Sequence, residues 1–221
     1  MNRAVIWDLD GTLVASAEQH WQAWREILAA EGISIGYEQF RATFGLRNEE
    51  YLPSWLGPGA SPEDVKRIGD AKEARYRRLL ERDRPVPLPG AMEWIERLAQ
   101  RGWRQAVATS APRLNVEAVV AALAWVRYFG ALVAAEDVRA GKPMPDVFLL
   151  AARRLDTPAR RCVVVEDAAA GIAAARRAGM ACIGVGPHAV ASADVAVSTL
   201  LDLDDDAFDR LISSRPKRAR H

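Results

Sequence analysis

The sequence predicts an α/β protein: a Rossmann-like parallel sheet core with helices on both faces, and an inserted α-helical cap domain. From Gly90 onward, short apolar segments alternate with helical patterns, and this repeat is typical of a parallel sheet covered by helices. Between the first apolar segment and residue 85, the sequence is instead helical throughout. The chain has 221 residues, modestly more than a usual single domain, which fits one core with a smaller insertion.

The first element is a short buried strand over residues 4–7, which runs into the sequence Asp8-Leu9-Asp10-Gly11-Thr12. Because side chains alternate along a strand, Asp8 and Asp10 face the same way, and Gly11 lets the chain turn away at once. Two crowded carboxylates stay ionised only when a cation or a shared proton offsets their repulsion. Hard carboxylate oxygens suit Mg²⁺, so magnesium is the expected counter-charge.

An Asp-x-Asp-Gly sequence also occurs in ordinary turns and at the start of calcium-binding loops. The calcium loop is excluded because it needs Gly at position 13 and Glu at position 19, where this chain has Leu13 and Gln19. A plain turn without chemistry stays open at this point, since an isolated motif is a weak signal.

The inserted segment is predicted to be a helical cap over residues 15–85. Helical patterns with Gly or Pro mainly at their borders cover residues 17–31, 37–44, 49–56 and 62–83. The Pro-rich segment 84–90 is stiff and cannot lie inside a helix, so it marks the return to the core. The core domain is therefore expected at residues 1–14 and 86–221, with a hinge near Val14 and Pro85.

The core continues as a regular alternation of elements. Helices are expected at residues 90–101, 112–124, 145–155 and 168–178. Strands are expected at residues 104–109, 131–134, 161–165 and 181–185. The carboxyl ends of parallel strands form one edge, where ligands bind, so the residues that follow these strands carry the most information.

Acids, hydroxyls and one cation meet at that predicted edge. In chain order they are Asp8, Asp10, Thr109, Ser110, Lys142, Glu166 and Asp167. Each alone has a structural explanation, such as a helix cap or a solvated loop charge. Together, these residues suit one kind of reaction.

This set suits the transfer of a phosphoryl group from a phosphate monoester, a dianion that repels an attacking carboxylate unless metal and ammonium charge offset the repulsion. Asp8 would be the nucleophile, and Asp10 would exchange protons with the departing alkoxide and the hydrolytic water. Lys142 would offset the remaining charge. Thr109 and nearby backbone N–H groups, those of Gly11 and Ser110 among them, would bind phosphoryl oxygens.

The metal ligands predicted from the same set are two acids at each of two strand ends. They are Asp8, Asp10 through its backbone carbonyl, Glu166 and Asp167.

The motifs and their order resemble the haloacid dehalogenase superfamily, in its members with a helical cap after the first motif. The resemblance covers the chain to about residue 200 and rests on four motifs in order: residues 8–12, Thr109, Lys142 and Glu166-Asp167. Residues 166–180 also resemble the fourth motif and the helix after it. The chain is similar to phosphoglycolate phosphatase and to β-phosphoglucomutase-like phosphatases. The resemblance implies an aspartyl-phosphate intermediate, a Mg²⁺ cofactor and a cap that closes over the substrate.

A phosphosugar mutase of the same superfamily is the alternative. The cap segment 18–24 resembles the part of β-phosphoglucomutase whose histidine helps to position the general acid, and Lys72 with Tyr76 resembles its cap lysine region. The Gly-x-Ser-Arg loop of the mutase appears here as Gly45-Leu46-Arg47-Asn48, without the Ser, and Pro112 stands where a polar sugar-binding side chain is expected. These departures favour hydrolysis.

The cap is expected to choose the substrate, a small phosphorylated metabolite such as a sugar or polyol phosphate. The side chains expected to reach its leaving group are His20, Trp24, Arg47, Asn48 and Lys72. Because Trp21 and Trp24 are three residues apart on a helix, a packed apolar face is the alternative for them. A solvated helix face is the alternative for Lys72.

A receiver-like signalling domain is the alternative from another class, since it also combines acids, Thr and Lys on a parallel sheet. It is disfavoured because its phosphorylated Asp follows a later strand and it has no large helical insertion.

The composition gives no global attraction to nucleic acid or to anionic membranes, because 30 Lys and Arg face 29 Asp and Glu. Cys162 and Cys182 are expected to be buried free thiols of a reducing compartment. No signal segment precedes the first strand, and no apolar stretch approaches the roughly 20 residues that cross a bilayer. The expectation is a cytoplasmic protein, monomeric or weakly dimeric, with a frayed basic tail at residues 215–221.

Overall fold

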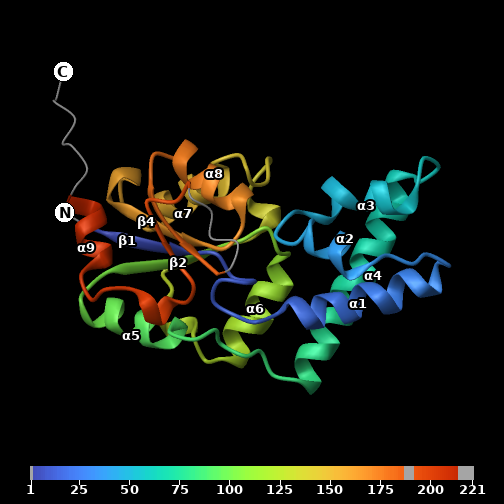
Figure 1. Ribbon diagram of the computed structural model, residues 1–221, viewed down its shortest axis with the longest axis horizontal. Coiled ribbons are helices and arrows are strands. Elements are labelled where there is room, and N and C mark those ends of the chain that lie inside the picture. Colours follow the sequence, from blue (N-terminus) through green and yellow to red (C-terminus); the bar gives the residue numbers. More distant parts are fainter. Residues whose placement is uncertain (1, 187–191, 214–221) are drawn as a thin grey trace.

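The computed structural model describes residues 2–186 and 192–213, in which a parallel sheet covered by helices lies beside a group of helices (Figure 1). The strands are β1 (Ala4–Trp7), β2 (Arg104–Ala108), β3 (Ala131–Val133), β4 (Cys162–Glu166), β5 (Ala181–Val185) and β6 (Val195–Val197). Within the described residues they form one sheet in the order β3-β2-β1-β4-β5-β6, with every pairing parallel. The chain fills one side of β1 first and then the other, so β1 and β4 meet where the strand order reverses.

The register of the three central strands brings their carboxyl ends level. Trp7 of β1 pairs with Val107 of β2 and with Val165 of β4. The next residue along β1 is Asp8, whose N–H donates to the Val165 carbonyl at 3.0 Å. Asp8 therefore lies beside the end of β4 and one residue before the level of Thr109.

Helices cover both faces of the sheet, as predicted. They are α5 (Ala91–Gln100), α6 (Arg113–Ala122), α7 (Asp146–Arg154), α8 (Ala169–Arg177) and α9 (Ala207–Ser213). Alternate residues of β1 enter two different apolar clusters, Trp7 with Val116 of α6, and Ile6 with Phe148 of α7. This period of two is what a fully buried parallel strand requires.

The remaining helices are α1 (Ala17–Ala30), α2 (Tyr37–Arg41), α3 (Asn48–Leu56) and α4 (Pro62–Arg82), which lie together beside the sheet (Figure 1). They enclose an apolar cluster of their own that includes Trp24, Phe40 and Leu52. The two chain connections to this unit run side by side, since the Ala15 N–H donates to the Val86 carbonyl at 2.9 Å. The proposed division into a core and a cap of residues 15–85 rests on this separate cluster.

Most elements end within one or two residues of their predicted bounds. The helix predicted over residues 37–44 ends at Arg41, followed by a turn in which the Thr43 hydroxyl donates to the Phe40 carbonyl. Glu166 is the last residue of β4 rather than the residue after it. The sequence patterns did not indicate β6 or α9, and the basic tail at 215–221 lies outside the described residues.

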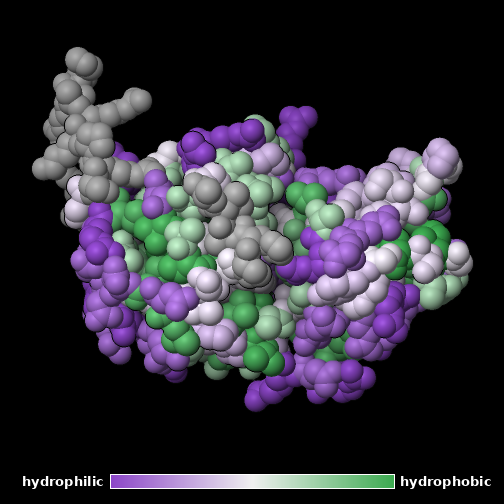
Figure 2. Space-filling model, in the orientation of Figure 1, coloured by the Kyte–Doolittle hydropathy of each residue, from purple (hydrophilic) through white to green (hydrophobic). Residues whose placement is uncertain are grey.

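Hydrophilic side chains dominate the rim of the face in Figure 2, and hydrophobic ones reach the surface in separate groups. Among the described helices, none combines the length and apolarity needed to span a bilayer. Cys162 is a buried free thiol and Cys182 is buried as well, as expected.

Candidate active site

Lys142 lies between two carboxylates at the carboxyl edge of the sheet. Its Nζ is 2.5 Å from Asp8 Oδ1 and 2.6 Å from Glu166 Oε1, and all three side chains are buried. Burial raises the pKa of Asp8, and the charge of Glu166 raises it further, while Lys142 opposes both. Burial lowers the pKa of Lys142, but attraction to Asp8 and Glu166 outweighs burial and raises it overall. The lysine is thus held as an ammonium.

Asp167 adds a third carboxylate to this cluster. Burial raises its pKa well above the usual range, and Glu166 and Asp8 add to the shift. One ligand oxygen of each of Asp8, Glu166 and Asp167 can be chosen so that all lie within 4.8 Å of one another. Three carboxylates against one ammonium leave uncompensated negative charge, so a hard divalent cation with oxygen ligands fits this site.

Two glycines make room for the acidic cluster. A Cβ at Gly11 would lie 2.2 Å from Asp167 Oδ2, and its φ of +86° also disfavours any other residue. A Cβ at Gly171 would lie 1.8 Å from Glu166 Oε1. At Gly11, any other residue would therefore strain the backbone and displace the Asp167 carboxylate.

Asp10 faces the cap helices. Its Oδ1 accepts a hydrogen bond from the Ser16 hydroxyl at 2.6 Å and lies 3.4 Å from His20 Nε2. Burial favours a higher pKa for Asp10, but hydrogen bonds from His20 and Ser16 outweigh it and lower the pKa.

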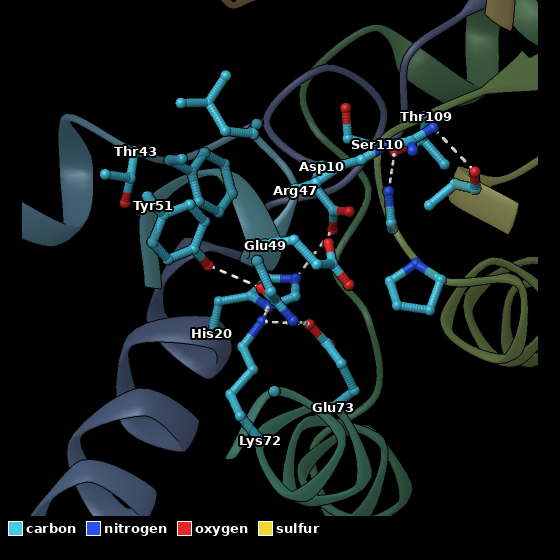
Figure 3. A pocket seen from close by; sticks show the side chains of 18 of the residues that line it. Asp10, His20, Thr43, Arg47, Glu49, Tyr51, Lys72, Glu73, Thr109 and Ser110 are labelled. Atoms are coloured by element: carbon cyan, nitrogen blue, oxygen red, sulfur yellow. Dashed lines mark hydrogen bonds and ion pairs between the residues drawn. The ribbon is translucent and has the colours of Figure 1, made fainter. Parts of the chain in front are cut away.

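Thr109 and Ser110 follow β2 and complete the core side of the site. Thr109 is buried, and its Oγ1 accepts a hydrogen bond from the Ala111 N–H at 3.1 Å. Both residues line a cavity of about 470 Å³ together with Asp8, Asp10 and residues of the cap (Figure 3). A cavity of this size suits a small metabolite.

The cap residues predicted to reach the substrate all line this cavity: His20, Trp24, Arg47, Asn48 and Lys72. His20 lies between Asp10 and Lys72 (Figure 3), and its Nδ1 is 2.9 Å from Lys72 Nζ. Lys72 is only 3% exposed, so it does not lie on a solvated helix face. The Trp24 ring is fully buried in the apolar cluster of the cap, and Lys72 Nζ lies 5.0 Å from its centroid.

Arg47 and Asn48 are engaged with protein groups rather than free. Arg47 Nη2 donates to the carbonyls of Ala135 and Val138, at 2.8 and 3.2 Å, and so links the cap to the core. Asn48 Nδ2 donates to Glu73 Oε1 at 2.8 Å.

Sequence patterns did not single out Ser16 or Glu73, although both belong to the site. A Ser directly before a helical pattern predicts an N-terminal helix cap. The Ser16 side chain makes no such hydrogen bond to the start of α1, and its hydroxyl donates to Asp10 instead. Glu73 lies in a charge-rich stretch that is typical of a solvated face, and no local pattern marks it as buried.

The doubly wound sheet thus carries the acidic cluster and Lys142 together at its carboxyl edge. Residues 2–179 match the family model of the haloacid dehalogenase-like hydrolases. The chain belongs to this family and is an enzyme of the phosphoric monoester hydrolase class.

Similar proteins include the protein CbbY of Rhodobacter capsulatus, 35% identical over 80% of this chain and 82% of that protein. Fructose-1-phosphate phosphatase YqaB of Escherichia coli is 34% identical over 82% of this chain and 95% of its own length. The crystal structure of β-phosphoglucomutase from Clostridium difficile superimposes with a TM-score of 0.87 at 26% identity, covering 96% of this chain and 98% of that one.

Proposed function

We propose that this protein is a Mg²⁺-dependent phosphatase that hydrolyses a small phosphorylated metabolite, a sugar phosphate or related polyol phosphate, through an aspartyl phosphate on Asp8. The observation that carries the proposal is the contact of Asp8 with Lys142 at the edge of a cavity that cap residues also line. The names of the relatives CbbY and YqaB, and of β-phosphoglucomutase, support a phosphorylated sugar as the substrate class.

In the proposed reaction, a carboxylate oxygen of Asp8 attacks phosphorus while the bond from phosphorus to the ester oxygen breaks. Asp10 gives a proton to the departing alkoxide and later accepts one from the water that hydrolyses the aspartyl phosphate. Lys142 offsets charge beside Asp8, and Thr109 with the N–H groups of Gly11 and Ser110 would bind phosphoryl oxygens.

Asp8, Glu166, Asp167 and the backbone carbonyl of Asp10 would hold Mg²⁺. The ion would supply positive charge where the phosphoryl oxygens gather.

A panel of phosphorylated metabolites with MgCl₂ tests the proposal. Release of inorganic phosphate by wild type, and not by Asp8→Asn, is the expected result. The panel includes β-glucose 1-phosphate with a bisphosphate primer, because the similarity to β-phosphoglucomutase and the His20–Lys72 contact favour a mutase as the second candidate. Conversion to the 6-phosphate without phosphate release would replace the phosphatase by the mutase. Phosphorylation by acetyl phosphate with neither activity would favour the receiver-like domain.

The cytoplasmic location and the monomeric or weakly dimeric state stay predictions from the sequence.

A further inference from the structure

Glu73 of the cap helix α4 is a buried carboxylate with both oxygens engaged. Its Oε1 accepts hydrogen bonds from Lys72 Nζ and Asn48 Nδ2, each at 2.8 Å. Its Oε2 accepts one from Asn115 Nδ2 at 2.6 Å. Asn115 belongs to the core helix α6, so this last bond crosses from the cap to the core.

Asn115 holds α4 at two points. Its Nδ2 donates to Glu73, and its Oδ1 accepts from Arg77 Nη1 at 2.9 Å, one helical turn further along α4. The Asn115 side chain is 1% exposed, its bond to Glu73 is buried, and its bond to Arg77 is partly buried. An amide provides both the donor and the acceptor that this arrangement needs, whereas a carboxylate or an alkyl group of the same size does not.

The contacts of Glu73 continue to Asp10 through Lys72 and His20 (Figure 3). An ammonium can only donate, so His20 Nδ1 accepts from Lys72 and the ring proton lies on Nε2, which faces Asp10 Oδ1 at 3.4 Å. The imidazole also stacks on Tyr76, with ring centroids 3.7 Å apart. Lys72 thus decides which nitrogen of His20 can donate to Asp10.

Glu73 in turn keeps Lys72 in place. Burial favours a higher pKa for this carboxyl, but Lys72 and His20 outweigh burial and lower the pKa. The carboxylate is therefore charged, and it is the counter-ion of a lysine that is itself almost fully buried.

We propose that Glu73 and Asn115 are positioning residues. They couple the packing of the cap against α6 to the orientation of the His20 ring, whose Nε2 faces Asp10. When Asn115 donates to Glu73, the Glu73 carboxylate holds Lys72 against His20 Nδ1. When the cap separates from α6, Glu73 loses its bond to Asn115, and the contacts from Lys72 to His20 and from His20 to Asp10 become less well fixed. The inference rests on the proposed function, in which Asp10 is the general acid.

The test compares two phosphate esters that need the acid to different extents. The leaving group of β-glycerophosphate is an alkoxide, which requires a proton. The leaving group of p-nitrophenyl phosphate is a stabilised phenolate, which does not. Single-turnover rates with MgCl₂ isolate the first chemical step. Glu73→Gln is expected to lower the rate with the alkyl ester by about 10- to 100-fold, because misplacing a catalytic group lowers rates by factors of this order. The rate with the aryl ester should fall by less than about 3-fold.

Asn115→Leu is the second variant, since it breaks the contact between cap and core but keeps the ion pair of Lys72 with Glu73. It is expected to slow the alkyl ester selectively by about 10-fold. It therefore tests the coupling even when Glu73→Gln does not fold.

Glu26→Gln is the matched control, because it makes the same change in an exposed pair with Arg75 of the same helix α4. It should leave both rates unchanged. Equal losses on both esters in the Glu73 and Asn115 variants, or no loss, would overturn the inference while the wild-type activity still supports the proposed function. Failure of the wild type to release phosphate from these esters and from every metabolite of the panel would overturn the proposed function itself, and the inference with it.

Discussion

At the scale of single residues, the acidic cluster places three carboxylates closer together than is favourable for the stability of the fold. Asp8, Glu166 and Asp167 are held close together in a buried site where one ammonium balances only part of their charge. Folding such groups together opposes the native state unless a cation joins them. The proposed nucleophile, Asp8, is thus held in a site that lowers the stability of the fold.

Asp8→Asn is expected to lower phosphatase turnover by at least about 10³-fold, since an amide cannot form the covalent intermediate. The same change removes an ionisable group from a cluster in which the pKa values of Asp8 and Asp167 are raised by burial. In EDTA the variant should therefore unfold at the wild-type temperature or above it, as measured by circular dichroism. Retained steady-state hydrolysis of p-nitrophenyl phosphate would contradict the assignment of the nucleophile.

Cys162 provides a prediction about pH. Burial raises the pKa of its thiol to about 12, and its Sγ lies 3.5 Å from the Pro158 carbonyl oxygen. An unfolded thiol titrates near about pH 8.5, so above that pH the unfolded state loses a proton that the folded state keeps. This contribution to stability is complete below about pH 8.5 and falls by up to about 1.4 kcal/mol per pH unit towards pH 12.

Urea unfolding at pH 8 and pH 10 measures that loss, and Cys162→Val should show a smaller loss than wild type. An equal loss in the two proteins would show that the thiol does not titrate in this way.

The residues that sequence could predict are those placed by strand ends. Asp8, Thr109, Glu166 and Asp167 follow buried apolar runs, and the parallel register is enough to bring them together. The Glu73–Asn115 contact joins residues 42 positions apart through the docking of two helices, so no periodicity indicates it.

At the scale of elements, α4 supplies Lys72 and Glu73 to the candidate site. It bears Lys72, Glu73 and Arg77, and it packs against α1 and α6. It begins with a capping box in which the Asp64 N–H donates to Ser61 Oγ at 3.1 Å and the Ser61 N–H donates back to Asp64 Oδ2.

Ser61→Ala is expected to destabilise the protein by about 1 kcal/mol, because it leaves a helix N–H without its partner. Ser61 lies at the N-terminus of α4, away from the proposed catalytic residues. The value of kcat should therefore stay within about 2-fold of wild type at a temperature where both proteins are folded. Urea unfolding and phosphate release measure the two effects. A large loss of activity without a shift in the urea midpoint would contradict this assignment.

Elements with strong apolar patterns were predictable, and short ones at the end of the sheet were not. The strand at 181–185 and the cap helices predicted over 17–31 and 62–83 follow clear patterns and agree closely with the structure. Strand β6 has three residues and no buried one, so it forms by pairing with β5 rather than through an apolar run of its own. Helix α9 is identified by tertiary packing, since Phe208 contacts Trp7 and Trp94.

At the scale of the whole molecule, the strand order and the inserted cap bring together residues from both ends of the chain. The sheet reverses its order beside β1, which creates a crevice at the carboxyl ends of β1 and β4, and the cap covers that crevice. The acidic cluster and Lys142 therefore come from the core, while most of the residues that line the cavity lie between positions 20 and 73.

Metal binding should stabilise the entire fold, because a cation that binds only the folded cluster shifts the unfolding equilibrium. At a Mg²⁺ concentration 100 times its Kd, the gain is about 2.7 kcal/mol. Thermal unfolding of EDTA-treated protein is therefore expected to shift to higher temperature on addition of MgCl₂ and to return with excess EDTA. NaCl of matched ionic strength should not reproduce the shift, since general screening does not depend on a specific site. Asp167→Asn removes one proposed ligand without touching the nucleophile, and it should lose most of the Mg²⁺-dependent gain; an unchanged gain in this variant would place the ion outside the Asp8, Glu166 and Asp167 cluster.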